Sequence, residues 1–242
     1  MLAVLAVLAV PAGLSSAAAA DRESCQARSG PVPPTVVELY TSEGCSSCPP
    51  ADRWLAGVAK GGEVVALAFH VSYWNHLGWQ DPFATEVTTG RQYRFKEATG
   101  AAYVYTPQVL LNGKDWRGWR GRDPSGLPRL PAGDAPALRL SRAADRVTAE
   151  ISPSAAGGRL AGYWAVLADG LVSRVGAGEN AGRTLEHDHV VSHYLPVDPW
   201  DASAGQQVTL TLPDAGRGER VSFVVTDSRL IRPVQAVVLS CD

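Results

Sequence analysis

Two cysteines at C-x-x-C spacing give this chain its clearest chemistry. Cys45 and Cys48 follow the apolar run 36–40 and precede a segment, 51–59, whose apolar residues have helical spacing. Thiols at this separation can close a small disulfide ring, and the start of a helix favours a thiolate through its partial positive charge and unpaired N–H groups. The pattern predicts a redox dithiol in which Cys45 is the nucleophile and Cys48 resolves the mixed disulfide.

Other chemistries of these residues stay open. Half of a zinc site would need two more ligands, and the remaining cysteines, Cys25 and Cys241, lie far away in the sequence. A disulfide that never turns over is a second alternative. Copper or zinc capture by His187, His189 and His193 is a third, if these histidines share one unbroken strand. No carboxylate or thiol completes that set, so we assign no metal ligands.

The first 20 residues have the pattern of a secretory signal. An apolar stretch at 2–10 is followed by small residues that end in Ala20, where we expect cleavage. An uncleaved membrane anchor is the alternative, although the apolar stretch is shorter than the ~20 residues needed to span a bilayer. In an oxidising compartment an even number of cysteines favours disulfides. We therefore expect a secreted, periplasmic protein in which Cys25 and Cys241 form a structural bridge between the mature termini.

The bulk composition is that of an ordinary soluble protein. The chain has 242 residues, a formal net charge of −2 and 45% hydrophobic residues. This charge gives no electrostatic reason to expect a nucleic-acid partner. The sequence contains no phosphate-binding loop and no serine nucleophile elbow, and we expect no cofactor. After signal cleavage we expect no stable membrane insertion.

The segments on either side of the dithiol have the order β-α-β. A strand at 35–40, a helix at 51–59 and an apolar strand at 63–71 follow one another. A helix at 85–100 comes next, and a later strand turns at Asn112-Gly113, a strong hairpin signal. This order places the dithiol at the end of the first strand.

The segment 73–83 is rich in aromatic residues and has no clear period. We favour a hydrophobic plug packed against a second domain. The alternative is a lid or groove wall beside the dithiol, in which Tyr73, Trp74 and Trp79 grip a partner. His70 follows a buried run, so it is expected to be a packed core residue.

The second half of the chain has an all-β pattern. The segment 123–136 is rich in Pro, Gly and Arg and is typical of a linker. Short strands with frequent turns then suggest a sandwich. The expected organisation is a signal at 1–20, a linker at 21–34, an α/β domain at 35–122, the linker 123–136 and a β-sandwich-like domain at 137–242. The expected strands are 146–151, 160–168, 171–175, 189–195, 207–212, 221–226 and 235–239.

Several motifs carry a resemblance to a known family. They lie at 38–52, 69–75, 77–83, 91–93, 105–108, 178–185 and 190–191. The span 36–119 resembles the thioredoxin-like superfamily, and more narrowly the chain resembles DUF1223, a secreted bacterial family of unknown function. The resemblance implies an α/β thioredoxin-like domain in which a Thr106-Pro107 loop, with a cis or an ordinary trans bond, faces the dithiol and positions the substrate chain. The segment 178–185 then braces the domain interface or covers the dithiol.

The leading hypothesis is a secreted thiol–disulfide oxidoreductase that acts on a protein or on a small thiol or disulfide. Whether the dithiol turns over is left open. One alternative is a non-catalytic binding module of the same fold with a permanent Cys45–Cys48 disulfide. The other is a periplasmic metal-handling protein that uses the dithiol together with the histidines.

Overall fold

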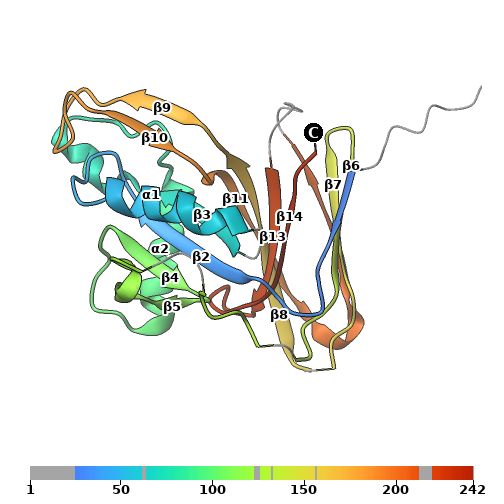
Figure 1. Cartoon of the computed structure of the whole chain (residues 1–242). Coiled ribbons are helices and arrows are strands. Elements are labelled where there is room, and N and C mark those ends of the chain that lie inside the picture. The colour runs from blue at the N-terminus through green and yellow to red at the C-terminus, as the bar shows by residue number, and fades with distance from the viewer. Residues whose placement is uncertain are drawn as a thin grey trace, which may run out of the picture.

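The computed structural model describes residues 25–61, 64–122, 126–131, 133–155, 157–212 and 220–241 (Figure 1). The secretory signal predicted at residues 1–20 lies outside these ranges. Within them, no helix combines the length and the apolar character needed to cross a membrane.

Strands dominate the described chain. They are β1 (Cys25–Arg28), β2 (Thr35–Thr41), β3 (Val64–His70), β4 (Gln108–Leu111), β5 (Lys114–Asp115), β6 (Leu138–Ala143), β7 (Arg146–Ile151), β8 (Arg159–Ala168), β9 (Leu171–Arg174), β10 (Thr184–His187), β11 (Val190–Asp201), β12 (Gln206–Thr211), β13 (Arg220–Asp227) and β14 (Pro233–Leu239). The α-helices are α1 (Pro49–Val58) and α2 (Glu86–Thr99). Short 3₁₀ helices are η1 (Ala59–Gly61), η2 (Ser72–Leu77), η3 (Arg117–Trp119) and η4 (Ala202–Ala204).

The largest sheet has the strand order β14-β13-β8-β11-β3-β2-β4-β5. β2 and β3 are parallel and α1 connects them, so the predicted β-α-β unit is present. All seven residues of β2 are buried, which accounts for its mostly apolar sequence. β4 and β5 form an antiparallel hairpin closed by Asn112 and Gly113, whose φ angles of 50° and 76° suit a tight two-residue turn.

The predicted fold class, an α/β thioredoxin-like domain followed by a separate all-β sandwich-like domain, is wrong. The chain is mostly β, and one eight-stranded sheet continues from its first half into its second. β11 makes the connection, because Val190 pairs with Ala68 of β3 while the strand also pairs along β8. The backbone N–H of Ala68 donates to the carbonyl of His189 at 2.8 Å, so the chain at the start of β11 satisfies the edge of β3 at this point. The residue boundaries given above stay a prediction.

A four-stranded sheet, ordered β1-β6-β7-β12, packs against the β8, β13 and β14 part of the large sheet (Figure 1). Side chains from both sheets, including Leu140, Val147, Trp164 and Phe223, form one buried cluster. β1 lies inside the predicted linker 21–34 and pairs with β6. The second sheet therefore recruits a strand from the N-terminal part of the chain.

A disulfide joins the two ends of the described chain. It links Cys25, at the start of β1, to Cys241, which follows β14, across a sequence separation of 216 residues. Closing so long a loop restricts the unfolded chain and stabilises the fold by about 3–5 kcal/mol in the chain-entropy account.

The two helices lie on opposite faces of the large sheet. Leu55 of α1 packs with Leu39, whereas Phe95 of α2 packs with Tyr40, the next residue of β2. Alternate residues of a strand point to opposite faces, so the two helices are separated by the sheet. α2 begins at Thr85, where a reciprocal capping box satisfies the first backbone N–H groups.

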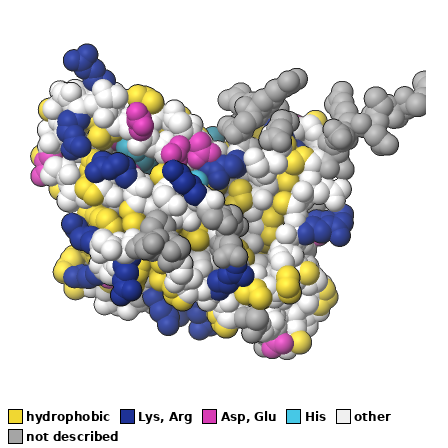
Figure 2. Space-filling view, in the orientation of Figure 1, with side chains coloured by type: hydrophobic (Ala, Val, Ile, Leu, Met, Phe, Trp, Pro, Cys, Tyr) yellow, Lys and Arg dark blue, Asp and Glu magenta, His cyan; other side chains and the backbone are white. Residues whose placement is uncertain are grey.

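Charged side chains are distributed widely over the surface. Figure 2 shows Lys and Arg side chains spread over one face with hydrophobic side chains between them. The residues drawn in colour on this face do not gather into one large basic surface of the kind that tracks nucleic-acid phosphates.

A buried ion pair lies between α2 and β2. Arg91 donates to Glu38 through Nε at 3.1 Å and Nη2 at 2.5 Å, and Nη1 donates to the hydroxyl of Tyr194 at 3.1 Å. Glu38 also accepts from the hydroxyls of Tyr40 at 3.0 Å and Tyr163 at 2.9 Å. Burial lowers the pKa of Arg91, but Glu38 outweighs this effect and holds the pKa well above its ordinary value, so the guanidinium stays charged.

We predict that Arg91→Met lowers the free energy of unfolding by about 3–5 kcal/mol, because the Glu38 carboxylate is left buried without its counter-charge. Glu38→Gln/Arg91→Met is expected to lose less than Arg91→Met alone, since no charge is then stranded. Urea unfolding at neutral pH measures both. Arg53→Met, at an exposed arginine of α1, is the control and is expected to change the free energy by less than about 0.5 kcal/mol. A loss for Arg91→Met as small as that of the control would contradict the prediction.

Candidate functional site

The Cys45–Cys48 disulfide lies in the turn between β2 and α1, and Cys48 is the N-cap of the helix. Only 1% of the surface of Cys45 and 0% of that of Cys48 is exposed, whereas Ser46 and Ser47 between them are exposed. The Sγ of Cys45 lies 3.4 Å from the Oγ of Ser47. The loop that carries the dithiol thus reaches solvent while its sulfur-bearing residues are covered.

The N-terminus of α1 offers a thiolate fewer free backbone N–H groups than its position alone suggests. The first two residues of α1 are Pro49 and Pro50, which carry no backbone N–H. The N–H groups of Ala51 and Asp52 both donate to the carbonyl of Cys48, at 2.8 Å and 3.1 Å. The helix dipole still points its positive end at the dithiol, but these backbone groups are absent or already paired.

Glu43, two residues before Cys45, is buried, and its carboxylate connects the dithiol turn to later parts of the chain. Its carboxylate accepts hydrogen bonds from Trp79 Nε1 at 2.7 Å and from the hydroxyl of Ser173 in β9. His187 Nε2, at the end of β10, lies 3.0 Å from Oε1. Burial raises the pKa of Glu43, but the hydrogen bonds from His187, Ser173 and Trp79 together hold it below its ordinary value of 4.5.

A second buried carboxylate supports the same turn. Asp81 Oδ2 accepts from the backbone N–H of Glu43 at 2.9 Å and lies 2.8 Å from His70 Nδ1. Burial raises the pKa of Asp81, but the charge of His70 outweighs it and the pKa lies below its ordinary value. Burial lowers the pKa of His70, but Asp81 raises it overall. The two groups form a buried ion pair beneath the dithiol turn.

The two histidines of this cluster are in ring contact. The ring centroids of His70 and His187 are 4.9 Å apart, and Phe83 packs edge-on against both. His70 Nε2 and His187 Nδ1 have no hydrogen-bond partner within the described ranges. Nearby on α1, burial raises the pKa of Asp52, whose Oδ2 accepts from Thr41 at 3.2 Å. Residues on both sides of the dithiol, Glu43 and Asp52, thus belong to one buried cluster of acids and histidines.

The segment that joins β9 to β10 covers the dithiol turn. Glu179 Oε2 accepts from both the backbone N–H and the hydroxyl of Ser46, each at 2.8 Å. Asn180 is fully buried, and its Nδ2 donates to the carbonyls of Glu43 and Cys45, each at 2.9 Å. These contacts hold the cover on both sides of Cys45.

The Thr106-Pro107 loop is connected to the dithiol turn through Trp74. The Thr106–Pro107 peptide bond is cis, and Trp74 Nε1 donates to Thr106 Oγ1 at 2.7 Å. A Cβ atom at Gly44 would lie only 2.8 Å from the Cβ of Trp74, so the tryptophan packs directly on the residue before Cys45. A glycine is therefore required at this close approach.

The other aromatic residues of 73–83 pack inward. Tyr73 packs beside the core, and burial raises its pKa to about 12. Trp79 donates to Glu43 and lies against Gly176 of the cover, 3.1 Å from the position of a Cβ there. These residues form the wall between the dithiol turn and the cover, and a part in gripping a partner stays a prediction.

The three histidines named from the sequence have separate surroundings. His187 ends β10 and contacts Glu43, whereas His189 has a φ of 59° and accepts from Arg220 at 2.8 Å. His193 lies further along β11 beside Ser192. No group of three or more His, Cys, Asp or Glu residues in the described part of the chain is placed to hold a metal ion.

Sequence reasoning missed the buried polar groups around the dithiol. Glu43 and Asp81 lie in the motifs at 38–52 and 77–83, but no local pattern assigns their partners, because Glu43 meets a histidine 144 residues away and Asp81 meets the backbone 38 residues away. The same kind of signal existed for the cover, since Glu179 and Asn180 lie in the motif at 178–185. Only the folded chain shows that this motif contacts Cys45.

Comparison with known proteins places the chain in a family. Residues 36–226 match the family described as "Protein of unknown function (DUF1223)", and the chain belongs to it. A crystal structure of a protein from Agrobacterium tumefaciens is 29% identical, with a TM-score of 0.66 over 86% of this chain and 94% of that one. HBP35 of Porphyromonas gingivalis is 14% identical, with a TM-score of 0.55 over 87% of this chain and 76% of its own, which shows a similar fold alone. No curated protein matches the chain.

Because the carboxylate of Glu43 is ionised in the folded protein, we predict that the stability of the fold depends on pH. Because folding lowers the pKa of Glu43, its contribution is fully present above its ordinary pKa of 4.5 and is lost as the pH falls through the folded pKa. We predict that Glu43→Gln lowers the free energy of unfolding by about 2 kcal/mol at pH 7 and flattens its decline in acid.

Urea unfolding at a series of pH values between about 3 and 7 tests this, over the range where carboxylates titrate. Glu97→Gln, at an exposed glutamate of α2, is the control and is expected to follow the wild-type profile. Parallel profiles for wild type and Glu43→Gln would show that Glu43 does not carry the acid dependence.

Proposed function

We propose that the chain is a secreted, periplasmic protein that exchanges its Cys45–Cys48 disulfide with thiols of a protein or small-molecule partner. The observation that carries the proposal is the position of this disulfide, in a turn at the N-terminus of α1. A second disulfide, Cys25–Cys241, already ties the chain ends, so the first is free to serve chemistry. The signal-like residues 1–20 support secretion.

The exchange proceeds in two balanced steps. A partner thiolate attacks Sγ of Cys45, the Cys45–Cys48 bond breaks, and Cys48 leaves as a thiolate that takes up a proton. A second partner thiol then loses its proton and attacks the partner's sulfur in the mixed disulfide, which releases reduced Cys45. The partner dithiol is oxidised to a disulfide and the protein is reduced, and the reverse sequence starts from Cys45 as nucleophile. Thr106 and Pro107, joined to the turn through Trp74, position the partner chain.

Access is the step that the fold controls. Cys45 is 1% exposed, so a partner thiolate reaches it only when the cover from β9 to β10 moves away. Glu179 is exposed and holds Ser46 through two hydrogen bonds, whereas the buried Asn180 holds the turn more firmly. Exposed contacts of this kind are weak and break readily. We infer that the cover opens from its Glu179 end.

Substitution of each cysteine tests the exchange. Cys45→Ser is expected to abolish electron transfer from a peptide dithiol. Cys48→Ser, treated with the oxidised form of the same peptide, is expected to accumulate a mixed disulfide at Cys45, because the Cys45 thiolate breaks the peptide disulfide and the resolving thiol is missing. Acid quenching, thiol alkylation and mass spectrometry measure both. Cys25→Ser/Cys241→Ser is the control and, checked for folding by circular dichroism, is expected to keep the wild-type rate. Equal rates for wild type and Cys45→Ser would favour the non-catalytic binding module with a permanent disulfide.

The cover makes a separate prediction. Glu179→Ala is expected to raise the rate at which dithiothreitol reduces Cys45–Cys48 by about two- to fivefold, because the exposed contacts with Ser46 are lost. Glu186→Ala removes an exposed glutamate of the same hairpin and serves as the control. Alkylation of free thiols during a reduction time course gives the rates. A Glu179→Ala rate equal to that of wild type would mean that this contact does not limit access.

A further inference from the structure

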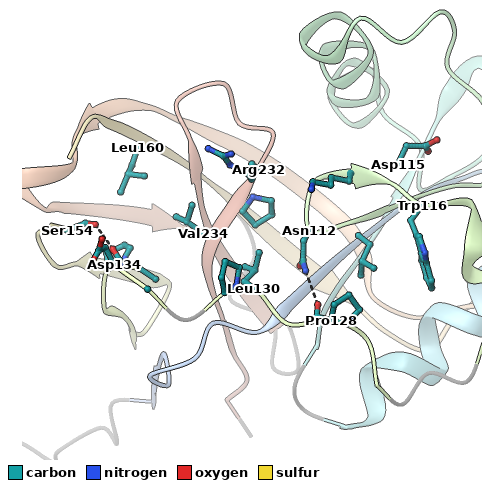
Figure 3. Close-up of a pocket in the computed structure, with 17 residues that line it drawn as sticks. Asn112, Asp115, Trp116, Pro128, Leu130, Asp134, Ser154, Leu160, Arg232 and Val234 are labelled. Carbon is teal, nitrogen blue, oxygen red and sulfur yellow. Dashed lines mark hydrogen bonds between the residues drawn. The ribbon is translucent and has the colours of Figure 1, made fainter. Parts of the chain in front are cut away.

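A groove of 740 Å³ lies where the β4–β5 hairpin meets the start of β14. Figure 3 shows its walls, with Trp116 and Asp115 at one end and Ser154, Asp134 and Leu160 at the other. The volume is in the range of sites that bind small molecules. It is not part of the dithiol site, because the groove begins at Leu111, the far end of β4 from Pro107.

The floor of the groove is apolar. Leu111, Leu130, Leu160 and Pro233 line it, and each is buried. Trp116 adds a half-buried aromatic wall. Covering such a surface removes apolar area from water, which is favourable, so the floor favours an apolar ligand.

Two positively charged residues lie close together on the rim of the groove. A Cβ at Gly113 would lie 2.3 Å from the carbonyl oxygen of Ile231 and 3.0 Å from Cα of Arg232, so the two backbones touch there. Lys114 and Arg232 follow this contact, and both are exposed and line the groove. Within the described ranges, neither side chain has a carboxylate partner. Their positive charge is therefore available to a ligand.

The carboxylates of the groove do not cancel this charge. Asp115 is engaged elsewhere, with the hydroxyl of Tyr105 at 2.6 Å, Gln108 Nε2 at 3.2 Å and Arg117 Nε at 3.4 Å. Asp134 lies at the other end, beside Ser154 (Figure 3). The charge along the groove is therefore polarised. Uncompensated positive charge lies at the hairpin, and a carboxylate lies at the far end.

The walls are held in place before any ligand arrives. Asn112 donates to the carbonyl of Pro128 at 2.9 Å (Figure 3). It also accepts from the backbone N–H of Val36 at 2.9 Å. Thr35 donates to the same carbonyl of Pro128 at 3.0 Å. These bonds join the hairpin, β2 and the segment 126–131 into one frame, so a ligand does not have to order the groove.

We propose that this groove binds an amphipathic anion, an elongated apolar molecule that carries one carboxylate. The apolar body lies along the leucine-lined floor toward Leu160. The carboxylate lies at the rim between Lys114 and Arg232, because Asp134 repels it from the other end. An aliphatic carboxylic acid fits both requirements, whereas a neutral alcohol of equal length meets only the first.

The proposal is tested by titrating the purified full chain with decanoate and, separately, with decanol. Isothermal titration calorimetry measures the binding. Decanoate is expected to bind saturably with one site per chain. Lys114→Ala/Arg232→Ala is expected to weaken that binding about tenfold or more, since hydrogen bonds to charged groups contribute at this level. Lys60→Ala/Arg146→Ala removes an exposed lysine and arginine elsewhere and is expected to leave it unchanged.

A second variant tests the position of the apolar body. Gly133 lines the groove, and a Cβ there would meet no atom within 4 Å, so Gly133→Trp fills space without a clash at its own position. It is expected to weaken decanoate binding while the thermal unfolding of the free protein stays near that of wild type. Absence of saturable binding, decanol binding as tight as that of decanoate, or equal affinities in all variants would each overturn the proposal.

Discussion

The ion pair between Glu38 and Arg91 is the contact that most constrains this molecule. Two buried charges cost several kcal/mol each unless every donor and acceptor around them is satisfied. Here the partners come from β2, α2, β8 and β11, with Tyr163 and Tyr194 supplied by the second half of the chain. Neither half can complete this network alone. The charge balance of the core therefore requires the continuous sheet, and the sheet in turn fixes the end of β2 from which the dithiol turn departs.

The surroundings of the dithiol follow from the same arrangement. β2 and β3 end side by side at Thr41 and His70, and the turn to Cys45 starts there. β8 passes through the core and continues into the β9–β10 hairpin, which returns over the turn with His187 and Asn180. The dithiol thus sits in a joint made by residues from both halves of the chain. Its surroundings are therefore set by residues from both halves as much as by the helix behind it.

Local signals in the sequence were enough to predict most helices and strands, but not how they assemble. The β-α-β unit, the hairpin at Asn112 and most strands of the second half follow from short patterns, and the structure has them at nearly the predicted bounds. Pairing of Val190 with β3 and the contact of Glu43 with His187 join distant segments, and no period or spacing encodes them. The predicted fold class failed for this reason. Buried polar clusters are equally hidden: His70 could be assigned to the core from the apolar run before it, but its partner Asp81 could not.

The disulfide between Cys25 and Cys241 has a mechanical consequence. It joins the first strand of one sheet to the end of β14, the edge strand of the other. A pulling force applied to the chain outside these cysteines passes directly from one sulfur to the other. The strands between them stay slack and are not peeled from either sheet. The fold, including the covered dithiol, is thereby shielded from tension on its ends for as long as this bond stays oxidised.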